Sequence, residues 1–455
     1  INDTLVVVSP IAGGPSDQLG VMSGDRIVEI DGQTAIGIKT EDVLKRLRGD
    51  KGSKVAVRIE RPGEKALLSF TIVRDKIPTF SVDLAIMLSD KVGYIKISKF
   101  VQTTHEEFLA AADDLKKQGM KQLVLDLRGN PGGLLDQAIK IADEFLDSGK
   151  IVYTKSRNKA MDQTDFAKPG DTFEKNSVIV LVDKGSASAS EIVSGALQDQ
   201  DRAIIVGETT FGKGLVQRQF EFTDGSAMRV TVSRYYTPLG RQIQRSFKEG
   251  KEGREAYYSE AYHRGELDGL VKQGKNGQNP DSLLARNHIL ETAIFIKPDS
   301  LHPAYKTPSG RTLLGGGGIM PDYIIEPDTV TIYSRQLRSK RVLEEVAMQY
   351  VTEHNGTLKA AYKENMARFR NEFAIDPNLI KKVIELGKSK GVPFNQNAYQ
   401  KDEAYLKSVM KSKIARQIWG FKGEIAIMTG QDNVLNQALG LFQKADALAK
   451  IEPVK

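Results

Sequence analysis

Apolar residues in the middle of this chain follow two spacings, one typical of strands and one typical of helices. Residues 178–182 form a continuous apolar run rich in β-branched side chains, as in a buried strand, and residues 191–197 change to a helical spacing. The same order occurs at 122–143, where a buried strand runs into a glycine turn at 129–133 and then into a helix. Because strands and helices alternate, the sequence predicts a layered α/β fold for this region.

The N-terminal region predicts a smaller, β-rich module. Short apolar runs alternate with glycine turns, and a strand at 26–30 leads into the hairpin signal at 31–32. Residues 41–48 predict a helix with one apolar stripe, made of Val43, Leu44 and Leu47. These side chains are either core residues of the module or the wall of a binding pocket.

From about residue 331 the chain becomes polar and its apolar positions recur at helical spacing. The region carries no chemical motif. Helices with an apolar stripe pack on their own domain or on a second subunit, so both roles stay open. The predicted helices are 337–350, 358–373, 377–390, 403–419, 424–428 and 433–448.

The sequence divides into three predicted domains, at 1–77, 78–330 and 331–455. Within the second, residues 246–304 contain a polar, glycine-containing stretch at 274–280 and a predicted helix near 281–295.

Composition excludes several classes of protein. The 455 residues suffice for two to four domains. The fractions of hydrophobic residues, 40%, and of charged residues, 27%, are ordinary for a globular protein. The sequence contains no uninterrupted run of about 18 apolar residues, the length that a membrane-spanning helix needs. The net charge is +7, but the lysines and arginines are scattered among nearly as many acidic residues. No compact basic run contains aromatic residues, so nothing indicates nucleic-acid binding. The absence of cysteine excludes disulfides, thiolate metal sites and a cysteine nucleophile.

Ser188 is the candidate nucleophile because it falls on the turn between the strand at 178–182 and the following helix. Such a turn places a hydroxyl near the free N–H groups and the positive dipole end of a helix, where an oxyanion is stabilised. The alternative is a serine that only caps the helix. The five histidines lie in unrelated contexts, so none is an evident base for this serine.

Lys213 is the candidate base, and its neighbours Gly212 and Gly214 allow a lysine to approach the sheet closely. A lysine accepts a proton only when neutral, and about one ordinary lysine in a thousand is neutral at pH 7. We therefore expect Lys213 to be shielded from water. Gln217 is placed to hold the amine through its amide oxygen. The alternative is a surface lysine in a glycine loop.

An oxyanion site is expected from the backbone N–H of Ala189 together with an amide of the glycine turn, from either Gly132 or Gly133. The turn lacks the P-loop lysine and the dinucleotide glycine spacing, which argues against a nucleotide site. Structural roles are expected for Asp126, Arg128 and Glu191, the last with a contact to Lys213 as its alternative.

Four sequence blocks resemble the signature blocks of the carboxyl-terminal processing (tail-specific) proteases, the S41 peptidases. The blocks are DLRGNPGG (126–133), GSASASEI (185–192), GETTFGKGLVQ (207–217) and YTPLGRQIQ (236–244). In front of them the string GDRIVEIDG (24–32) resembles a PDZ domain, although the chain begins too late to include its carboxylate-binding loop. The resemblance covers residues 1 to about 245 and returns at 305–322. It therefore implies that residues 246–304, which interrupt the family pattern, are an insertion or a lid.

The resemblance implies a serine endopeptidase that cleaves proteins near their C-termini, with a crotonase-like or ClpP-like α/β core between a PDZ domain and a helical domain. It implies that Ser188 is the nucleophile, Lys213 its base and Gln217 the residue that orients the base. No metal or cofactor is expected. The PDZ domain would recognise substrate tails and gate the active site, with pocket residues among Val43, Leu44 and Leu47.

Expected partners are proteins with unstructured apolar C-termini, with a homo-oligomer through the C-terminal helices and a regulatory adaptor as further options. Neither nucleic acid nor an integral membrane segment is expected. Because family members mostly work in the bacterial periplasm or another exported space, we expect an exported protein whose signal peptide is not in this chain. Two other classes stay open: a catalytically silent PDZ scaffold, and an acyl-CoA enzyme of crotonase-like fold, which would need neither a PDZ module nor Lys213.

Overall fold

The computed structural model describes the chain from residue 4 to residue 448, leaving out 9, 12, 23, 62–63, 65, 78–79, 171–172, 246–289, 293–297, 299, 301 and 326–327. The chain forms two compact units, one from residues 1–79 with 329–432 and the other from 80–328 with 433–455. Most of the predicted insertion at 246–304, with its predicted helix near 281–295, lies outside the described residues. The described pair Leu290–Glu291 is the short strand β15, where a helix was predicted.

The N-terminal module is a small sheet with two short helices, as the sequence predicts. Its strands follow the order β1-β2-β4-β5, with β3 paired to β2. In β4 every second side chain points inward, so that Val55, Val57 and Ile59 are buried in the core. The elements are β1 (Leu5–Val6), α1 (Pro15–Gln18), β2 (Arg26–Ile30), β3 (Gln33–Thr34), α2 (Thr40–Leu47), β4 (Lys54–Glu60) and β5 (Leu68–Val73).

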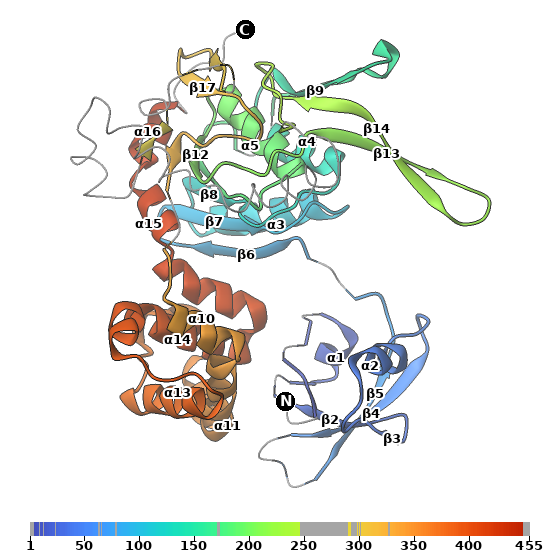
Figure 1. The fold of residues 1–455 in the computed structure, drawn as a ribbon, viewed down its shortest axis with the longest axis vertical. Helices are drawn as coiled ribbons and strands as arrows, with labels where there is room; N and C mark the ends of the chain where they lie inside the picture. Colours follow the sequence, from blue (N-terminus) through green and yellow to red (C-terminus); the bar gives the residue numbers. More distant parts are fainter. Residues whose placement is uncertain are drawn as a thin grey trace. The chain divides into compact units, whose positions relative to one another are not determined.

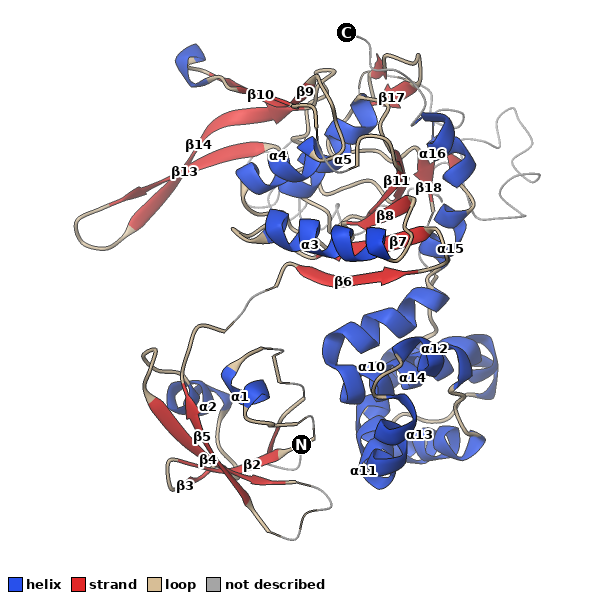
Figure 2. Ribbon diagram, turned by 180° about the vertical axis from the view of Figure 1, so that it is seen from behind, coloured by secondary structure: helices blue, strands red, loops and turns tan. Residues whose placement is uncertain are grey.

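The helices of residues 332–428 bury their apolar stripes in one cluster, around Leu337, Val346, Phe369 and Met410. Helix α14 is interrupted at Gly420, which has φ of 66° and breaks the regular helical path. The helices, drawn in blue in Figure 2, are α10 (Ile332–Ser339), α11 (Val342–Tyr362), α12 (Met366–Glu372), α13 (Pro377–Ser389) and α14 (Gln396–Met428), followed by the 3₁₀ turn η2 (Thr429–Gln431).

The second unit is built on a seven-stranded sheet, counted over the described residues, with the order β15-β18-β12-β11-β8-β7-β6. Its central strands pair in parallel and are largely apolar; every residue of β11 is buried, as expected for a sheet covered on both faces. The strands are β6 (Val82–Met87), β7 (Val92–Ile97), β8 (Gln122–Asp126), β11 (Ser177–Val182), β12 (Ile204–Gly207) and β18 (Tyr323–Ile324).

Three helices connect successive parallel strands and pack side by side on the sheet (Figure 1). They are α3 (Thr104–Lys117), α4 (Leu135–Asp143) and α5 (Ala189–Asp199). Because parallel crossovers are right-handed and these strands advance in one direction, the helices share one face. Loops at the carboxyl ends of β8, β11 and β12 therefore meet at one edge, which contains the glycine turn, Ser188 and the segment before Lys213.

A smaller four-stranded sheet has the order β10-β9-β14-β13. Its two longest-paired strands, β13 and β14, form a hairpin that extends beyond the helices of the core (Figures 1 and 2). The elements are β9 (Lys150–Ser156), the 3₁₀ turn η1 (Lys159–Met161), β10 (Thr164–Phe166), β13 (Leu215–Glu221) and β14 (Ala227–Tyr236), and a separate hairpin is formed by β16 (Ala304–Lys306) and β17 (Thr312–Leu314).

The last described helices, α15 (Asn433–Leu439) and α16 (Phe442–Leu448), pack against β11 of the core sheet. The carboxylate of Asp446 accepts hydrogen bonds from Gln122 Nε2, at 2.9 Å, and from the Ser177 hydroxyl. The helices predicted as one domain over 331–455 thus separate near residue 432. The multidomain α/β architecture predicted from the sequence is confirmed. In the described part of the chain, no helix has the length and hydrophobicity to cross a membrane.

Candidate active site

Ser188 lies on the turn between β11 and α5, as predicted, and it is the N-cap residue of α5. Its backbone has φ of 56° and ψ of −111°, a conformation that residues other than glycine rarely adopt. Such strain costs on the order of 1–3 kcal/mol and persists only where surrounding contacts hold it. The turn presents the serine at the carboxyl edge of the sheet and at the positive end of the α5 dipole.

The Glu191 carboxylate holds this turn in place. Its Oε2 accepts hydrogen bonds from the backbone N–H of Ser188, at 2.7 Å, and of Lys213, at 2.8 Å. Its Oε1 accepts from the Gly212 N–H and the Thr210 hydroxyl, both at 2.6 Å. One carboxylate therefore links the backbone of the candidate nucleophile to the backbone of the candidate base.

Glu191 is completely buried. Burial raises the pKa of this carboxyl group, and the four hydrogen bonds oppose that effect because they favour the ionised form. The sequence predicts a structural role for Glu191, with a contact to Lys213 as the alternative. The structure combines the two, since the contact is with the Lys213 backbone.

The glycine turn packs directly against the nucleophile. A Cβ added to Gly132 would lie 2.7 Å from Ser188 Cβ and 2.8 Å from the Ala189 nitrogen, and Gly132 has φ of 93°. A side chain at this position would displace the serine. The Gly132 N–H donates to Asn130 Oδ1 at 2.9 Å.

Gly133 pairs with Phe100 across the turn. The two bonds of this bridge run from the Phe100 N–H to the Gly132 carbonyl, at 3.0 Å, and from the Leu134 N–H to the Phe100 carbonyl, at 2.9 Å. Because these bonds flank Gly133, its own N–H points away from Phe100. Ala189, the first residue of α5, has an N–H with no intrahelical acceptor.

Asp183 connects the two loops that form the site. Its Oδ1 accepts from the N–H of Gly129, at 2.8 Å, and of Gly185, at 2.9 Å. Asp183 is not among the residues predicted from the sequence. The signal that could have identified it is its position immediately after the buried strand that leads to Ser188.

The backbone of Lys213 is tied to the site through Glu191, but the side chains of Lys213 and Gln217 are exposed to solvent. Gly214 packs against the segment before Arg245, and its N–H donates to Gln244 Oε1 at 3.0 Å. Within the described residues, no hydrogen bond joins the side chain of Ser188 to that of Lys213 or Gln217. The shielding from water that the sequence analysis expected for Lys213 is absent from this conformation.

Asp126 and Arg128, at the carboxyl end of β8, form a buried ionic cluster. Arg128 Nη2 and the Tyr94 hydroxyl each lie 2.6 Å from Asp126 Oδ2, and Lys96 Nζ lies 3.5 Å away. Burial alone would raise the pKa of Asp126, but the charges of Arg128 and Lys96 hold it well below its usual range. The cluster fixes the strand end from which the glycine turn begins.

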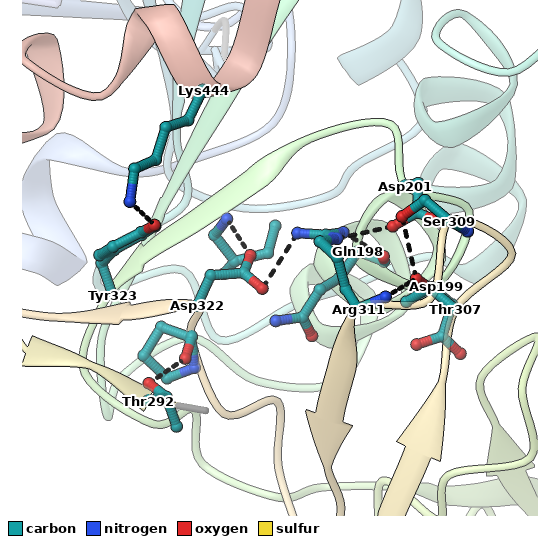
Figure 3. Close-up of polar contacts among 12 residues, drawn as sticks. Gln198, Asp199, Asp201, Thr292, Thr307, Ser309, Arg311, Asp322, Tyr323 and Lys444 are labelled. Carbon is teal, nitrogen blue, oxygen red and sulfur yellow. Dashed lines mark hydrogen bonds and ion pairs between the residues drawn. The ribbon is translucent and has the colours of Figure 1, made fainter. Parts of the chain in front are cut away.

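The far end of α5 is held by a second ionic network, drawn in Figure 3. Arg311 contacts Asp201 at 2.6 Å and Asp322 at 3.2 Å, and donates to the Gln198 carbonyl at 2.8 Å. The Arg311 guanidinium complements the negative end of the helix dipole. Burial raises the pKa of Asp322, and the charge of Arg311 opposes this effect. Helix α5 is thus fixed at both ends, by Glu191 and by Arg311.

The three helix residues predicted to line a peptide pocket differ in environment. Val43 is 8% exposed, Leu47 packs against the core of the N-terminal module, and Leu44 is 44% exposed. Of these three side chains, Leu44 is therefore the most available to a ligand.

Comparisons with known proteins agree with this geometry. Residues 91–250 match the model of peptidase family S41, and residues 6–61 match a PDZ domain model. Residues 333–420 match a family of unknown function.

Two similar proteins are carboxyl-terminal-processing proteases. That of Picosynechococcus sp. is 40% identical over 245 residues, which cover 53% of this chain and 59% of the relative. That of Bartonella bacilliformis is 41% identical over 247 residues, which cover 53% and 56%. The chain thus spans less than two thirds of these relatives. Among solved structures, a photosystem II D1 C-terminal processing protease is 34% identical, covering 53% of this chain and 66% of its own, with a TM-score of 0.33.

Proposed function

Because residues 91–250 belong to peptidase family S41 and residues 6–61 to the PDZ domains, we propose that this chain is a serine endopeptidase of the carboxyl-terminal processing type. The observation that carries the proposal is the Glu191 carboxylate, which bonds to the backbone of both Ser188 and Lys213. A serine that merely caps a helix would need no such link to a lysine loop.

In the proposed reaction, Ser188 Oγ attacks the carbonyl carbon of the scissile peptide bond while its proton passes to Lys213 Nζ. The backbone N–H groups of Ala189 and Gly133 stabilise the oxyanion. We assign Gly133 in preference to Gly132, because the Gly132 N–H already bonds to Asn130.

The carbon–nitrogen bond then breaks, and the leaving amine takes the proton from Lys213. Water attacks the acyl ester with Lys213 again as base, which releases the new C-terminus and restores the serine. Gln217 orients the lysine amine. Since Lys213 is exposed in this conformation, substrate or a movement of the 212–217 segment must exclude water before the dyad works.

The PDZ module supplies tail recognition in this proposal. An extended apolar C-terminus would add beside the sheet and next to α2, with Leu44 as its exposed contact. Gating by this module, assembly through the C-terminal helices, control by an adaptor and an exported, periplasm-like location belong to the same proposal.

Cleavage of an unstructured protein with an apolar C-terminus, followed by mass spectrometry, tests the proposal. The parent should cut, Ser188→Ala and Lys213→Ala should lose cleavage by at least about 1,000-fold, and the rate should rise with pH because the amine must lose a proton. Equal cutting by all three proteins would refute the dyad. A parent that binds the tail without cutting it would instead support a catalytically silent PDZ scaffold.

A further inference from the structure

One face of the β13–β14 hairpin carries four apolar side chains and one charged residue, Arg218, and the other face is polar. Strand pairing places Phe220 opposite Met228 and Arg218 opposite Val230. Directly opposed residues share a face, and alternation along β13 adds Phe222, just past its end, to the same side. We name this apolar surface the hairpin stripe; it consists of Phe220, Phe222, Met228 and Val230.

The opposite face is polar. Gln219 lies opposite Arg229 and Gln217 opposite Thr231. Arg229 Nε donates to Gln219 Oε1 at 3.0 Å, so this face satisfies its polar groups at the surface. The contrast between the faces shows that the stripe is a sided feature and not a scatter of single exposed residues.

The stripe continues a buried surface. Closer to the core, Val216 and Tyr235 lie on the same face and pack into the main hydrophobic cluster. Farther out, the exposed fractions rise to 44% for Phe220 and 49% for Met228. Arg218 interrupts this surface on β13, and beyond Arg218 the side chains of this face are again apolar although the core that would cover them has ended.

The stripe also leads to the candidate active site. β13 begins at Leu215, two residues after Lys213, and contains Gln217. Over the described residues it is the end strand of its sheet, with one unpaired edge. An edge strand of this kind accepts an extended polypeptide through its free backbone groups, while neighbouring apolar side chains select the sequence.

We propose that the hairpin stripe binds an extended apolar segment of the substrate at a distance from the scissile bond, an inference that rests on the proposed function. Phe220 lies seven residues beyond Lys213, or about 23 Å at the rise of a strand. The segment should therefore lie about seven residues from the bond that is cut, on one side of it. Binding there holds the chain along β13 and directs it to Ser188.

The area of the stripe favours a single polypeptide segment over a second copy of this chain. Four side chains that are about half exposed offer on the order of 300–400 Å². A stable interface buries about 800 Å² on each partner. An extended chain of a few residues needs no more than the stripe supplies.

The test compares the variant Phe220→Ser/Met228→Ser with a matched control, Gln219→Ser/Arg229→Ser, which changes the cross-strand pair on the polar face. Each is assayed on long unstructured substrates with an apolar segment about seven residues before or after the cleaved bond. A serine-rich version of each substrate and a short peptide of about eight residues cut at the same bond complete the set.

The apolar variant should lose about tenfold or more in kcat/KM on one of the long apolar substrates, which corresponds to about 1.4 kcal/mol of lost binding in the transition state. The short peptide and serine-rich substrates should be cut at parental rates, and the control should match the parent throughout. Because the replaced side chains are exposed, circular dichroism should show an unchanged unfolding temperature. If the double variant does not fold, Phe222→Ser, at the turn, is measured instead with the same expectation.

Parental rates on both long apolar substrates would overturn the inference. An equal fall in kcat/KM on the short peptide would also overturn it. The hairpin would then act by supporting the lysine loop or by contacting a second subunit, and not by binding distant substrate residues. These results are distinguishable from failure of the proposed function, in which the parent itself would cut no substrate or would cut as Ser188→Ala does.

Discussion

At the scale of single residues, the candidate site is held together by hydrogen bonds to backbone amides more than by contacts between the side chains proposed to react. The sequence identifies Ser188, Lys213 and the glycine turn by type and order. It does not reveal that Glu191, whose bond to the Ser188 amide is local, also bonds to the amides of Gly212 and Lys213, because these two come from a separate loop. Asp183 was missed for the same reason: its two glycine partners lie in separate loops, so sequence spacing alone does not connect it to the site.

Gly132→Ala should abolish most cleavage activity. The added Cβ would meet Ser188 Cβ at 2.7 Å and the backbone adopts a φ of 93°, so the serine must move. A displacement of about 1 Å in a catalytic group costs about 100-fold in rate, measured as kcat on a short peptide.

Gly310→Ala is the matched control for this change. Gly310 has φ of 86°, and an added Cβ would meet nothing within 4 Å. It therefore bears similar backbone strain without a clash, and should lower the free energy of unfolding by about 1 kcal/mol while cleavage continues. Equal activity of the two variants would contradict the inference that a side chain at position 132 displaces Ser188.

At the scale of elements, α5 acts as a rigid support that is anchored at both ends. Its amino end carries Ser188 and Glu191, and its carboxyl end is tied to Arg311 (Figure 3). Periodicity predicts the strand–turn–helix unit well, since the buried run and the helical spacing are local signals. It does not predict the anchor at the carboxyl end, whose partner comes from a distant hairpin.

Arg311→Met should destabilise the core unit by about 3–5 kcal/mol, because Asp201 and Asp322 would be left buried without their cation. Thermal unfolding followed by circular dichroism measures the effect. Lys306→Met, an exposed change in the same hairpin, should alter the free energy of unfolding by about 0.5 kcal/mol or less. Similar unfolding temperatures for the two variants would show that the network contributes little.

At the scale of the whole molecule, the polypeptide leaves the core unit near residue 328 and returns to it at residue 433. The helical residues 332–428 have their own apolar cluster, whereas α15 and α16 complete the core sheet. The sequence predicts helices in both regions. It gives no sign of which cluster each one joins, because the apolar stripes of surface helices look alike.

A chain that ends after Gln431 should therefore lose the core unit and keep the helical one. It lacks Leu435 and Phe442, which are 1% and 6% exposed, and Val434, at 3%. Losing three buried side chains at about 1.5–3 kcal/mol each removes about 5–9 kcal/mol, comparable to the whole stability of a domain.

Limited proteolysis with mass spectrometry measures this outcome, which should be rapid cleavage within residues 80–328 and a surviving fragment around 332–428. A chain that ends after Leu448 serves as the control and should resist proteolysis like the parent. Protection of the core in the shorter chain would contradict the assignment of α15 and α16 to it.

The sequence by itself determined the kinds of element, the β-rich module and the α/β core, and it singled out the candidate serine, lysine and glycine-turn residues. These follow from spacing, turn chemistry and motif order, which are local properties. Tertiary structure alone decided that Glu191 and Asp183 join separate loops, that Lys213 is exposed, that α15 and α16 belong to the core, and that one face of the β13–β14 hairpin is left uncovered. Each of these depends on which surfaces meet in space, and burial, hydrogen-bond partners and exposure are set by distant residues that no local pattern identifies.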